Sequence, residues 1–297
     1  MKKCAVIYNK KSGSGKFLIY KDKIEKILND ENYEVEFYNV FDINDELYKK
    51  ILVLDKNDLV ITAGGDGTFN MLINEYIKNN SETVVTHLPF GTTNDISKNF
   101  NLKLNSIKDI LKGDILNLDI LNLNNKYFVY VAAIGTISSS SYQTKQSDKL
   151  KYKTFAYLHK VIDKIKKEGI EKYHIKYKTN GVEKEFRCNH IVISNAKGIA
   201  GVRDIFKNEY NDGLFEVTFI KADNIKDSIN SIVNIPKIKT NNIKTTNIIH
   251  FQTNNLELSF EEPPKNNFSI DGESYFVNHK NIKFGINKKV KMLIPKR

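Results

Sequence analysis

Within its first hundred residues the chain repeats one pattern three times: an apolar segment, a glycine-containing loop and the start of a helical pattern. The apolar segments are short enough to be buried strands, and the clearest helical pattern runs from Phe69 to Ile77. Strands that alternate with helices predict a parallel sheet covered by helices, as in a Rossmann-like α/β domain. Strands are predicted at 3–9, 33–40, 58–63 and 83–89.

The pattern changes after about residue 120, where strand segments outnumber helices. Residues 173–187 predict a hairpin, because Asn180-Gly181 at its centre is typical of a type I′ turn. One helix is expected over 148–167, and so many strands with so little helix predict a β-sandwich or a barrel, of which we expect the sandwich. Further strands are predicted at 190–196, 213–220, 247–253, 256–260 and 281–286.

These two halves predict two domains. An α/β nucleotide-binding domain is expected over 1–121 and is completed by the C-terminal segment 287–297. A β-rich substrate domain is expected over 122–286.

The formal net charge of +11 on 297 residues favours partners that carry negative charge, such as anionic membranes, nucleic acids or phosphorylated ligands. The lysines are spread along the whole chain, so a solvated basic surface is the plainer alternative. Aromatic residues are dispersed and no nucleic-acid motif occurs, so we expect no nucleic-acid partner.

The sequence also predicts where the protein works. Every apolar run is far shorter than the ~20 residues needed to span a bilayer, and the N-terminus lacks the apolar region of a signal peptide. Cys4 and Cys188 are the only cysteines, too few for a disulfide scaffold or a zinc site. We expect a cytoplasmic protein with two buried thiols.

The stretch AGGDGTFN at 63–70 sets three glycines around one aspartate directly after a predicted strand. Similar loops occupy 9–16 and 89–95, and each leaves the carboxyl end of a strand, where open α/β sheets bind ligands. Backbone N–H groups and the helix dipole favour phosphate there, and glycine lets the backbone come close to it. Neither G-x-G-x-x-G nor the P-loop sequence occurs, so the nucleotide site is predicted without a named motif.

Asp66 and Asp95 lie in two of these loops. A carboxylate beside a phosphate is repulsive unless a cation lies between them, and Mg²⁺ usually binds one or two carboxylates together with water and substrate phosphate. The two aspartates therefore predict a site for a magnesium nucleotide. The alternative is that both are turn or N-cap residues.

Four motifs together resemble the diacylglycerol kinase catalytic family, which includes bacterial soluble diacylglycerol kinases and sphingosine-kinase-like lipid kinases. GGDGT is shared with NAD kinases and by itself indicates only a wider superfamily. The G-T-x-N-D and late D-G-E elements make the resemblance more specific, and it extends in order along nearly the whole chain. The motifs are GGDGTFN at 64–70, PFGTTNDIS at 89–97, NDGLFEV at 211–217 and IDGE at 270–273.

The resemblance implies a role for each motif in phosphate transfer from ATP. Asp271 would take the proton from a lipid hydroxyl, and Glu273 would help to organise the nucleotide and metal. A carboxylate base within hydrogen-bond reach accelerates such a step on the order of 10²–10⁴-fold. The alternative for IDGE is a plain β-turn. ATP would be bound by Asn9, Ser12, Gly13, Gly64, Gly65, Asp66, Gly67, Thr68 and Thr92.

The resemblance also implies two magnesium sites. A catalytic Mg²⁺ would be held largely through water, and a second, structural Mg²⁺ would use one carboxylate and backbone carbonyls. The residues implied for the first site are Asp66, Asp95 and Asp119, and those for the second are Glu209, Asp212 and Leu214.

The implied protein is an ATP-dependent lipid kinase that phosphorylates a membrane lipid, with diacylglycerol as the expected acceptor and phosphatidic acid as the product. It would be peripheral at the inner face of an anionic membrane, and the family suggests a homodimer. Two alternatives stay open. A kinase for a soluble substrate, resembling NAD kinase, leaves 90–97 unexplained, and a non-catalytic nucleotide-binding protein leaves the three aspartates 66, 95 and 271 unexplained.

Overall fold

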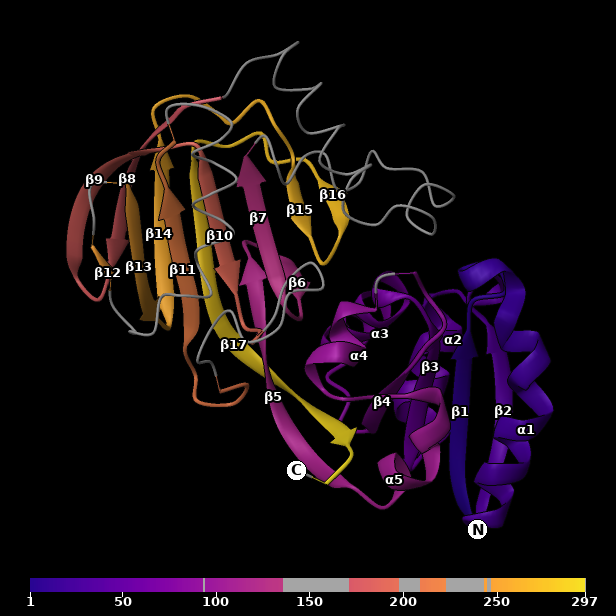
Figure 1. Ribbon diagram of the computed structural model, residues 1–297. Coiled ribbons are helices and arrows are strands. Elements are labelled where there is room, and N and C mark those ends of the chain that lie inside the picture. The colour runs from indigo at the N-terminus through magenta and orange to yellow at the C-terminus, as the bar shows by residue number, and fades with distance from the viewer. Residues whose placement is uncertain (93, 136–170, 198–208, 223–242, 245–246, 297) are drawn as a thin grey trace. The chain divides into compact units, whose positions relative to one another are not determined.

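The computed structural model describes residues 1–92, 94–135, 171–197, 209–222, 243–244 and 247–296 (Figure 1). The chain divides into two compact units. Unit 1 contains Met1–Ile120 and Lys288–Arg297, and unit 2 contains Leu121–Asn287. The helix expected over 148–167 lies outside the described residues. Whether each unit folds as an independent domain stays a prediction.

Unit 1 is built on a parallel sheet with the strand order β2-β1-β3-β4. Strand β17 extends it beside β4 through the pair Met292 and Val85. The central strands are buried along nearly their whole length, as expected when helices cover both faces. The strands are β1 (Lys2–Tyr8), β2 (Tyr33–Asn39), β3 (Leu59–Gly64) and β4 (Val84–Pro89), joined by β17 (Asn281–Ile294) and β5 (Asp114–Leu123).

The helices of unit 1 pack on this sheet in two groups. Helix α1 packs against β2 and α5, whereas α2 packs against α3. Right-handed crossovers therefore place α1 and α3 on opposite faces. The helices are α1 (Lys16–Asp30), α2 (Asp45–Lys49), α3 (Asp66–Lys78), α4 (Asp95–Asn99) and α5 (Ile107–Leu111), with shorter turns η1 (Ser12–Gly15), η2 (Val40–Asp42), η3 (Lys50–Leu54) and η4 (Leu104–Ser106).

Unit 2 consists of two antiparallel sheets, so the expected α/β and β-rich halves are confirmed. The first runs in the order β17, β14 (Asn255–Phe260), β8 (Tyr173–Thr179) and β9 (Val182–Cys188), and β6 (Lys126–Phe128) pairs with the end of β5. The second runs in the order β12 (Ile243–Lys244), β13 (Ile248–Thr253), β11 (Phe215–Ile220), β10 (His190–Ser194), β7 (Val131–Gly135), β15 (Phe268–Ile270) and β16 (Glu273–Tyr275).

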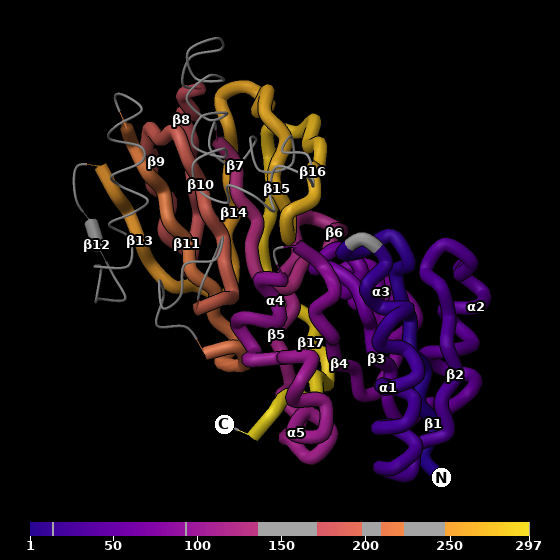
Figure 2. Tube along the Cα trace, turned by 45° about the vertical axis from the view of Figure 1, so that its right-hand side comes forward, coloured from indigo at the N-terminus to yellow at the C-terminus, as the bar shows by residue number. Residues whose placement is uncertain are grey.

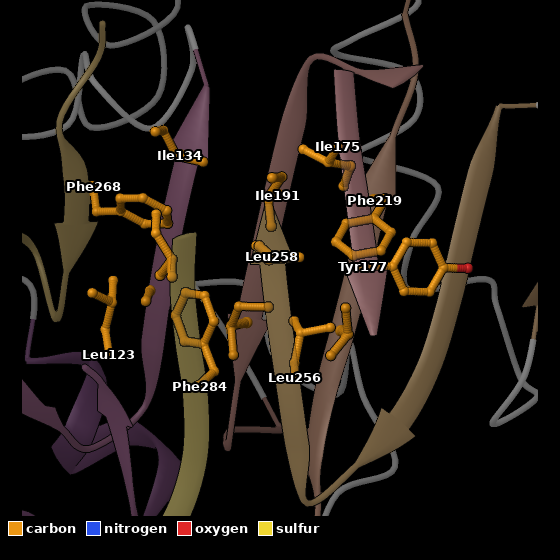
Figure 3. Close-up of a cluster of buried hydrophobic side chains, with 14 of the residues drawn as sticks. Leu123, Ile134, Ile175, Tyr177, Ile191, Phe219, Leu256, Leu258, Phe268 and Phe284 are labelled. Carbon is orange, nitrogen blue, oxygen red and sulfur yellow. The ribbon is translucent and has the colours of Figure 1, made fainter. Parts of the chain in front are cut away.

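Side chains from the two sheets of unit 2 form one hydrophobic core (Figure 3). The ring of Tyr177 on β8 lies 5.0 Å from that of Phe219 on β11, and Phe268 on β15 lies 6.0 Å from Phe284 on β17. Each pair joins opposite sheets, which is the arrangement of a β-sandwich.

The turn between β8 and β9 is the predicted one. Asn180 and Gly181 have φ of 49° and 76°, and a type I′ turn needs positive φ at both central residues. Among the described residues, no helix is both long and apolar enough to cross a lipid bilayer.

Candidate functional site

The three glycine-containing loops of unit 1 meet at one edge of the sheet, because they leave the carboxyl ends of the parallel strands β1, β3 and β4. Hydrogen bonds join each strand end to the next. The Asn9 N–H donates to the Ala63 carbonyl at 3.0 Å, and the Phe90 N–H donates to the Gly64 carbonyl at 2.8 Å. The loops at 9–16, 63–68 and 89–95 are therefore neighbours in space.

Glycines hold these loops in contact. A Cβ on Gly13, whose φ is +56°, would lie 2.2 Å from the Phe90 carbonyl oxygen, and one on Gly91 would lie 2.4 Å from the Gly65 Cα. Larger residues would push the loops apart. Gly65 differs, because its own Cβ would meet nothing closer than 3.5 Å. Packing within the protein therefore does not require a glycine at position 65. Close approach of a ligand to the backbone would require one, because a Cβ would occupy the space that the ligand needs.

Asp66 is the first residue of α3 and is 8% exposed. Its carboxylate accepts hydrogen bonds from the backbone N–H groups of Asp95 at 3.1 Å and Ile96 at 3.0 Å. Asp66 is not the N-cap of its own helix, which is Gly65; its side chain accepts from the first turn of a different helix, α4, and joins two of the loops. A role for Asp66 in binding metal stays a prediction.

Asp95 and Asp119 are buried and each has a lysine partner. The Asp95 carboxylate lies 3.0 Å from the Lys98 ammonium, and the Asp119 carboxylate lies 2.9 Å from the Lys289 ammonium. Binding of Mg²⁺ by Asp95 and Asp119 stays a prediction. In the described part of the chain, no group of three or more His, Cys, Asp or Glu could hold a metal.

The other residues predicted to bind ATP lie in the same three loops. The Asn9 side chain accepts the Lys11 N–H at 2.9 Å, and the Asn9 carbonyl accepts the Ser12 N–H at 3.0 Å, so this loop is internally ordered. Thr68 is buried in the first turn of α3, and Thr92 is half-buried. Gly67 lies in α3 between Asp66 and Thr68.

Asp271 lies in unit 2, in the tight turn between β15 and β16. Asp271 and Gly272 have φ of 47° and 87°, so IDGE is a β-turn, as the alternative interpretation proposed. Asp271 is also 2% exposed. Its carboxylate accepts three backbone N–H groups, from Val129 at 2.7 Å, Tyr130 at 3.0 Å and Val131 at 3.1 Å. Three donors fix the carboxylate and stabilise its negative charge.

The remaining predicted residues are less enclosed. Glu273 is exposed at the start of β16. Asp212 accepts the Leu214 N–H at 2.9 Å in a turn, and the Glu209 carboxylate lies 3.7 Å from the Lys197 ammonium. The second magnesium site stays a prediction.

Sequence reasoning missed three residues of the unit 1 site. Gly91 packs on Gly65, Asn94 donates to the Gly91 carbonyl at 2.8 Å, and Lys98 pairs with Asp95. The three-residue spacing of Asp95 and Lys98 on a helix was the one available signal. The positive φ of Asn94, 52°, depends on the tertiary contacts of its loop.

A cavity of about 530 Å³ lies elsewhere in unit 2. It is lined by residues 171–174 and 260–266, none of which was predicted to bind a ligand. Its lining carries both signs of charge, with Glu171, Glu261 and Glu262 beside Lys172 and Lys265.

The chain is similar to proteins of one family. The diacylglycerol kinase catalytic domain model matches residues 3–123. Diacylglycerol kinase of Bacillus subtilis (strain 168) is 24% identical over 279 residues, covering 92% of this chain and 90% of that protein. Diacylglycerol kinase of Staphylococcus epidermidis is 28% identical over 230 residues, covering 75% of this chain and 72% of that protein.

A solved structure has the same fold. The crystal structure of a diacylglycerol kinase from Bacillus anthracis str. Sterne superposes with a TM-score of 0.73 at 20% sequence identity. It covers 99% of this chain and 97% of the other.

Proposed function

We propose that the protein transfers the γ-phosphate of ATP to the hydroxyl of a membrane lipid, because residues 3–123 match the diacylglycerol kinase catalytic domain and the chain is 24% and 28% identical to two diacylglycerol kinases. Diacylglycerol is the acceptor in this proposal, and phosphatidic acid is the product. The similarity to diacylglycerol kinases supports a kinase, and the nucleotide, the metal and the lipid are the parts that we propose.

The meeting of three glycine-containing loops at the carboxyl edge of the parallel sheet carries the proposal. Such an edge offers backbone N–H groups and helix N-termini to phosphate. Gly65, which packing does not require to be glycine, marks where backbone and phosphate come close. Asp66 and Asp95 would hold Mg²⁺ through water and the nucleotide phosphates, and the bound ion would neutralise charge on the transferred group.

Asp271 is the proposed base. Its carboxylate accepts three backbone N–H groups. The same donors keep the carboxylate in one orientation, which a general base needs. Phosphate transfer otherwise requires little covalent chemistry from the protein, only alignment of the acceptor and stabilisation of charge.

The test is transfer of label from γ-labelled ATP, with Mg²⁺, to lipids in mixed micelles. Diacylglycerol, phosphatidylglycerol, ceramide, sphingosine and undecaprenol are each offered, with NAD in parallel. Asp271→Asn keeps the shape of the side chain and tolerates positive φ, but cannot act as the base. We expect label on diacylglycerol with the wild type, and a decrease on the order of 10²–10⁴-fold in the variant.

Binding of ATP by Asp271→Asn checks the nucleotide site of unit 1, and a urea transition like that of wild type checks that unit 2 is folded. Glu257→Gln is the matched control, since it removes an exposed carboxylate of the same unit that pairs with Lys283 at the surface. Label on NAD alone would assign the protein to a soluble substrate. ATP binding without label on any acceptor contradicts the proposed kinase activity on these lipids, and full activity of Asp271→Asn contradicts its role as the base.

A further inference from the structure

One peptide group links the candidate base to a neighbouring strand. The Tyr130 carbonyl and the Val131 N–H belong to the same peptide, and that N–H donates to the Asp271 carboxylate at 3.1 Å. The carbonyl at the other end of the peptide accepts the Ser194 hydroxyl at 2.9 Å and the Asn195 N–H at 3.0 Å. A peptide that is hydrogen-bonded at both ends therefore lies between Ser194 and Asp271.

Three adjacent strands of the second sheet of unit 2 bring these groups together. Ser194 ends β10 and pairs with Val131, the first residue of β7. Ile270 ends β15 and pairs with Ala132 on β7. The next residue, Asp271, donates its N–H to the Val131 carbonyl at 2.9 Å. Figure 2 shows β10, β7 and β15 side by side. The register of the sheet therefore fixes the path from Ser194 to Asp271.

The Ser194 hydroxyl is fully buried and is oriented by its own contacts. Its Oγ accepts the Ala196 N–H at 3.1 Å, and its hydrogen is directed at the Tyr130 carbonyl. Hydrogen bonds in such a chain polarise one another, so a donor to the carbonyl strengthens the N–H of the same peptide as a donor. Loss of the hydroxyl would therefore weaken the bond from the Val131 N–H to Asp271 and loosen the orientation of the peptide.

We propose that Ser194 is a positioning residue for the candidate base. Through the peptide between residues 130 and 131, the serine holds the Asp271 carboxylate in the orientation that removal of a proton requires. In that step the proton of the lipid hydroxyl moves to Asp271, while the lipid oxygen bonds to the γ-phosphorus and the bond from that phosphorus to ADP breaks. The inference rests on the proposed function and adds a residue that lies outside all four sequence motifs.

Unit 1 contains a serine in the same hydrogen-bonded arrangement, which supplies a matched control. The Ser81 hydroxyl donates to the Leu52 carbonyl at 2.8 Å, and its Oγ accepts the N–H of Thr83, two residues further along, at 3.3 Å. Ser81 is also buried. It precedes β4 and so lies at the opposite end of that strand from loop 89–95. Ser81→Ala therefore removes the same kind of hydroxyl without touching the candidate site.

The test is a double-mutant cycle in the labelled-lipid assay, made of Ser194→Ala, Asp271→Asn and the variant with both changes. Ser194→Ala should lower kcat about tenfold and leave KM for ATP and diacylglycerol unchanged, because orientation of the base matters in the transition state rather than in binding. Once Asp271 is asparagine, the serine has no base to orient, so the double variant should be as active as Asp271→Asn. The control Ser81→Ala should have the kcat of wild type.

Ser194→Cys retains a side chain of similar shape with a weak donor, so its kcat should lie between those of wild type and Ser194→Ala. Urea transitions check that each variant is folded, and if Ser194→Ala is not, Ser194→Cys takes its place in the cycle. If the wild type labels no lipid, the proposed function is wrong. If the wild type is active, then wild-type kcat in Ser194→Ala, a further tenfold loss in the double variant, or an equal loss in Ser81→Ala would overturn the positioning role alone.

Discussion

Asp66 combines two tasks that substitutions can separate. Its carboxylate caps α4 by accepting two backbone N–H groups, and we propose that it also holds magnesium. Asp66→Asn keeps one acceptor oxygen, so it should lose about 1 kcal/mol of stability, whereas Asp66→Ala loses both bonds and should lose about 2 kcal/mol. Both variants should lose lipid phosphorylation, because neither retains the charge.

Urea denaturation measures the stability of the two variants, and the labelled-lipid assay measures their activity. If Asp66→Asn is stable and has wild-type activity, Asp66 does not hold magnesium and its role is limited to capping α4. Stabilities in the reverse order would contradict the capping geometry.

At the scale of single residues, the sequence predicted which loops carry the candidate site residues, but it did not predict the contacts that those residues make. It placed Asp66 beside phosphate from the surrounding glycines, which is a local pattern. The Asp66 carboxylate accepts hydrogen bonds from the backbone of Asp95 and Ile96, which lie about thirty positions further along the chain. Lys289 pairs with Asp119, which is even more distant in sequence. Such contacts depend on which loops and strands become neighbours, which the local pattern does not specify.

The glycine loops make a prediction at the scale of elements. Gly13→Ala should lose about 2 kcal/mol or more of stability, because its positive φ and the Phe90 carbonyl both exclude a Cβ. Gly181→Ala, in the hairpin turn with nothing within 4 Å, isolates the cost of positive φ at about 1 kcal/mol. Gly65→Ala should change stability little and weaken ATP binding, because its backbone is proposed to approach phosphate.

Denaturation curves and ATP titrations of the three variants distinguish packing from binding. If Gly65→Ala bound ATP like wild type, this glycine would not mark the phosphate position. A Gly13→Ala protein as stable as Gly181→Ala would mean that the loops can move apart without cost.

The elements predicted from the sequence are those that contain a long run of regularly spaced apolar residues or a characteristic turn sequence. The hairpin of β8 and β9 was predicted because Asn180-Gly181 fixes the turn. Strands β15 and β16 have three residues each, too few for alternation to be read. Strand β17 was predicted only to 286, because exposed Asn287, Lys288 and Lys289 interrupt its alternation before the buried end that pairs with β4.

The whole molecule should lose stability in acid, because each unit buries a neutral histidine. Burial lowers the pKa of His87 in unit 1 to about 3 and that of His190 in unit 2 to about 4. The His87 Nδ1 lies 2.7 Å from the Thr62 hydroxyl, and within the described residues its Nε2 has no hydrogen-bond partner. These surroundings favour the uncharged imidazole, because an imidazolium would need a hydrogen-bond acceptor at Nε2.

The sign of the effect follows from the two states. The unfolded chain takes up a proton on each histidine near pH 6.5, while the folded protein does not until much lower pH. Their contribution is complete above about pH 6.5 and falls by roughly 1.4 kcal/mol per pH unit for each histidine as the pH decreases toward the folded values. Between about pH 6.5 and about pH 5, each histidine should therefore remove about 2 kcal/mol.

Urea unfolding at about pH 7 and about pH 5 measures this loss in the wild type, His87→Gln and His190→Gln. Each variant is expected to be less stable than wild type at neutral pH, yet to lose about 2 kcal/mol less on acidification. An unchanged acid loss in His87→Gln would mean that the folded protein accommodates a charged ring there. Since His87 and His190 lie in different units, a smaller acid loss in both variants would show that burial of a neutral histidine makes each unit acid-sensitive by the same physical route.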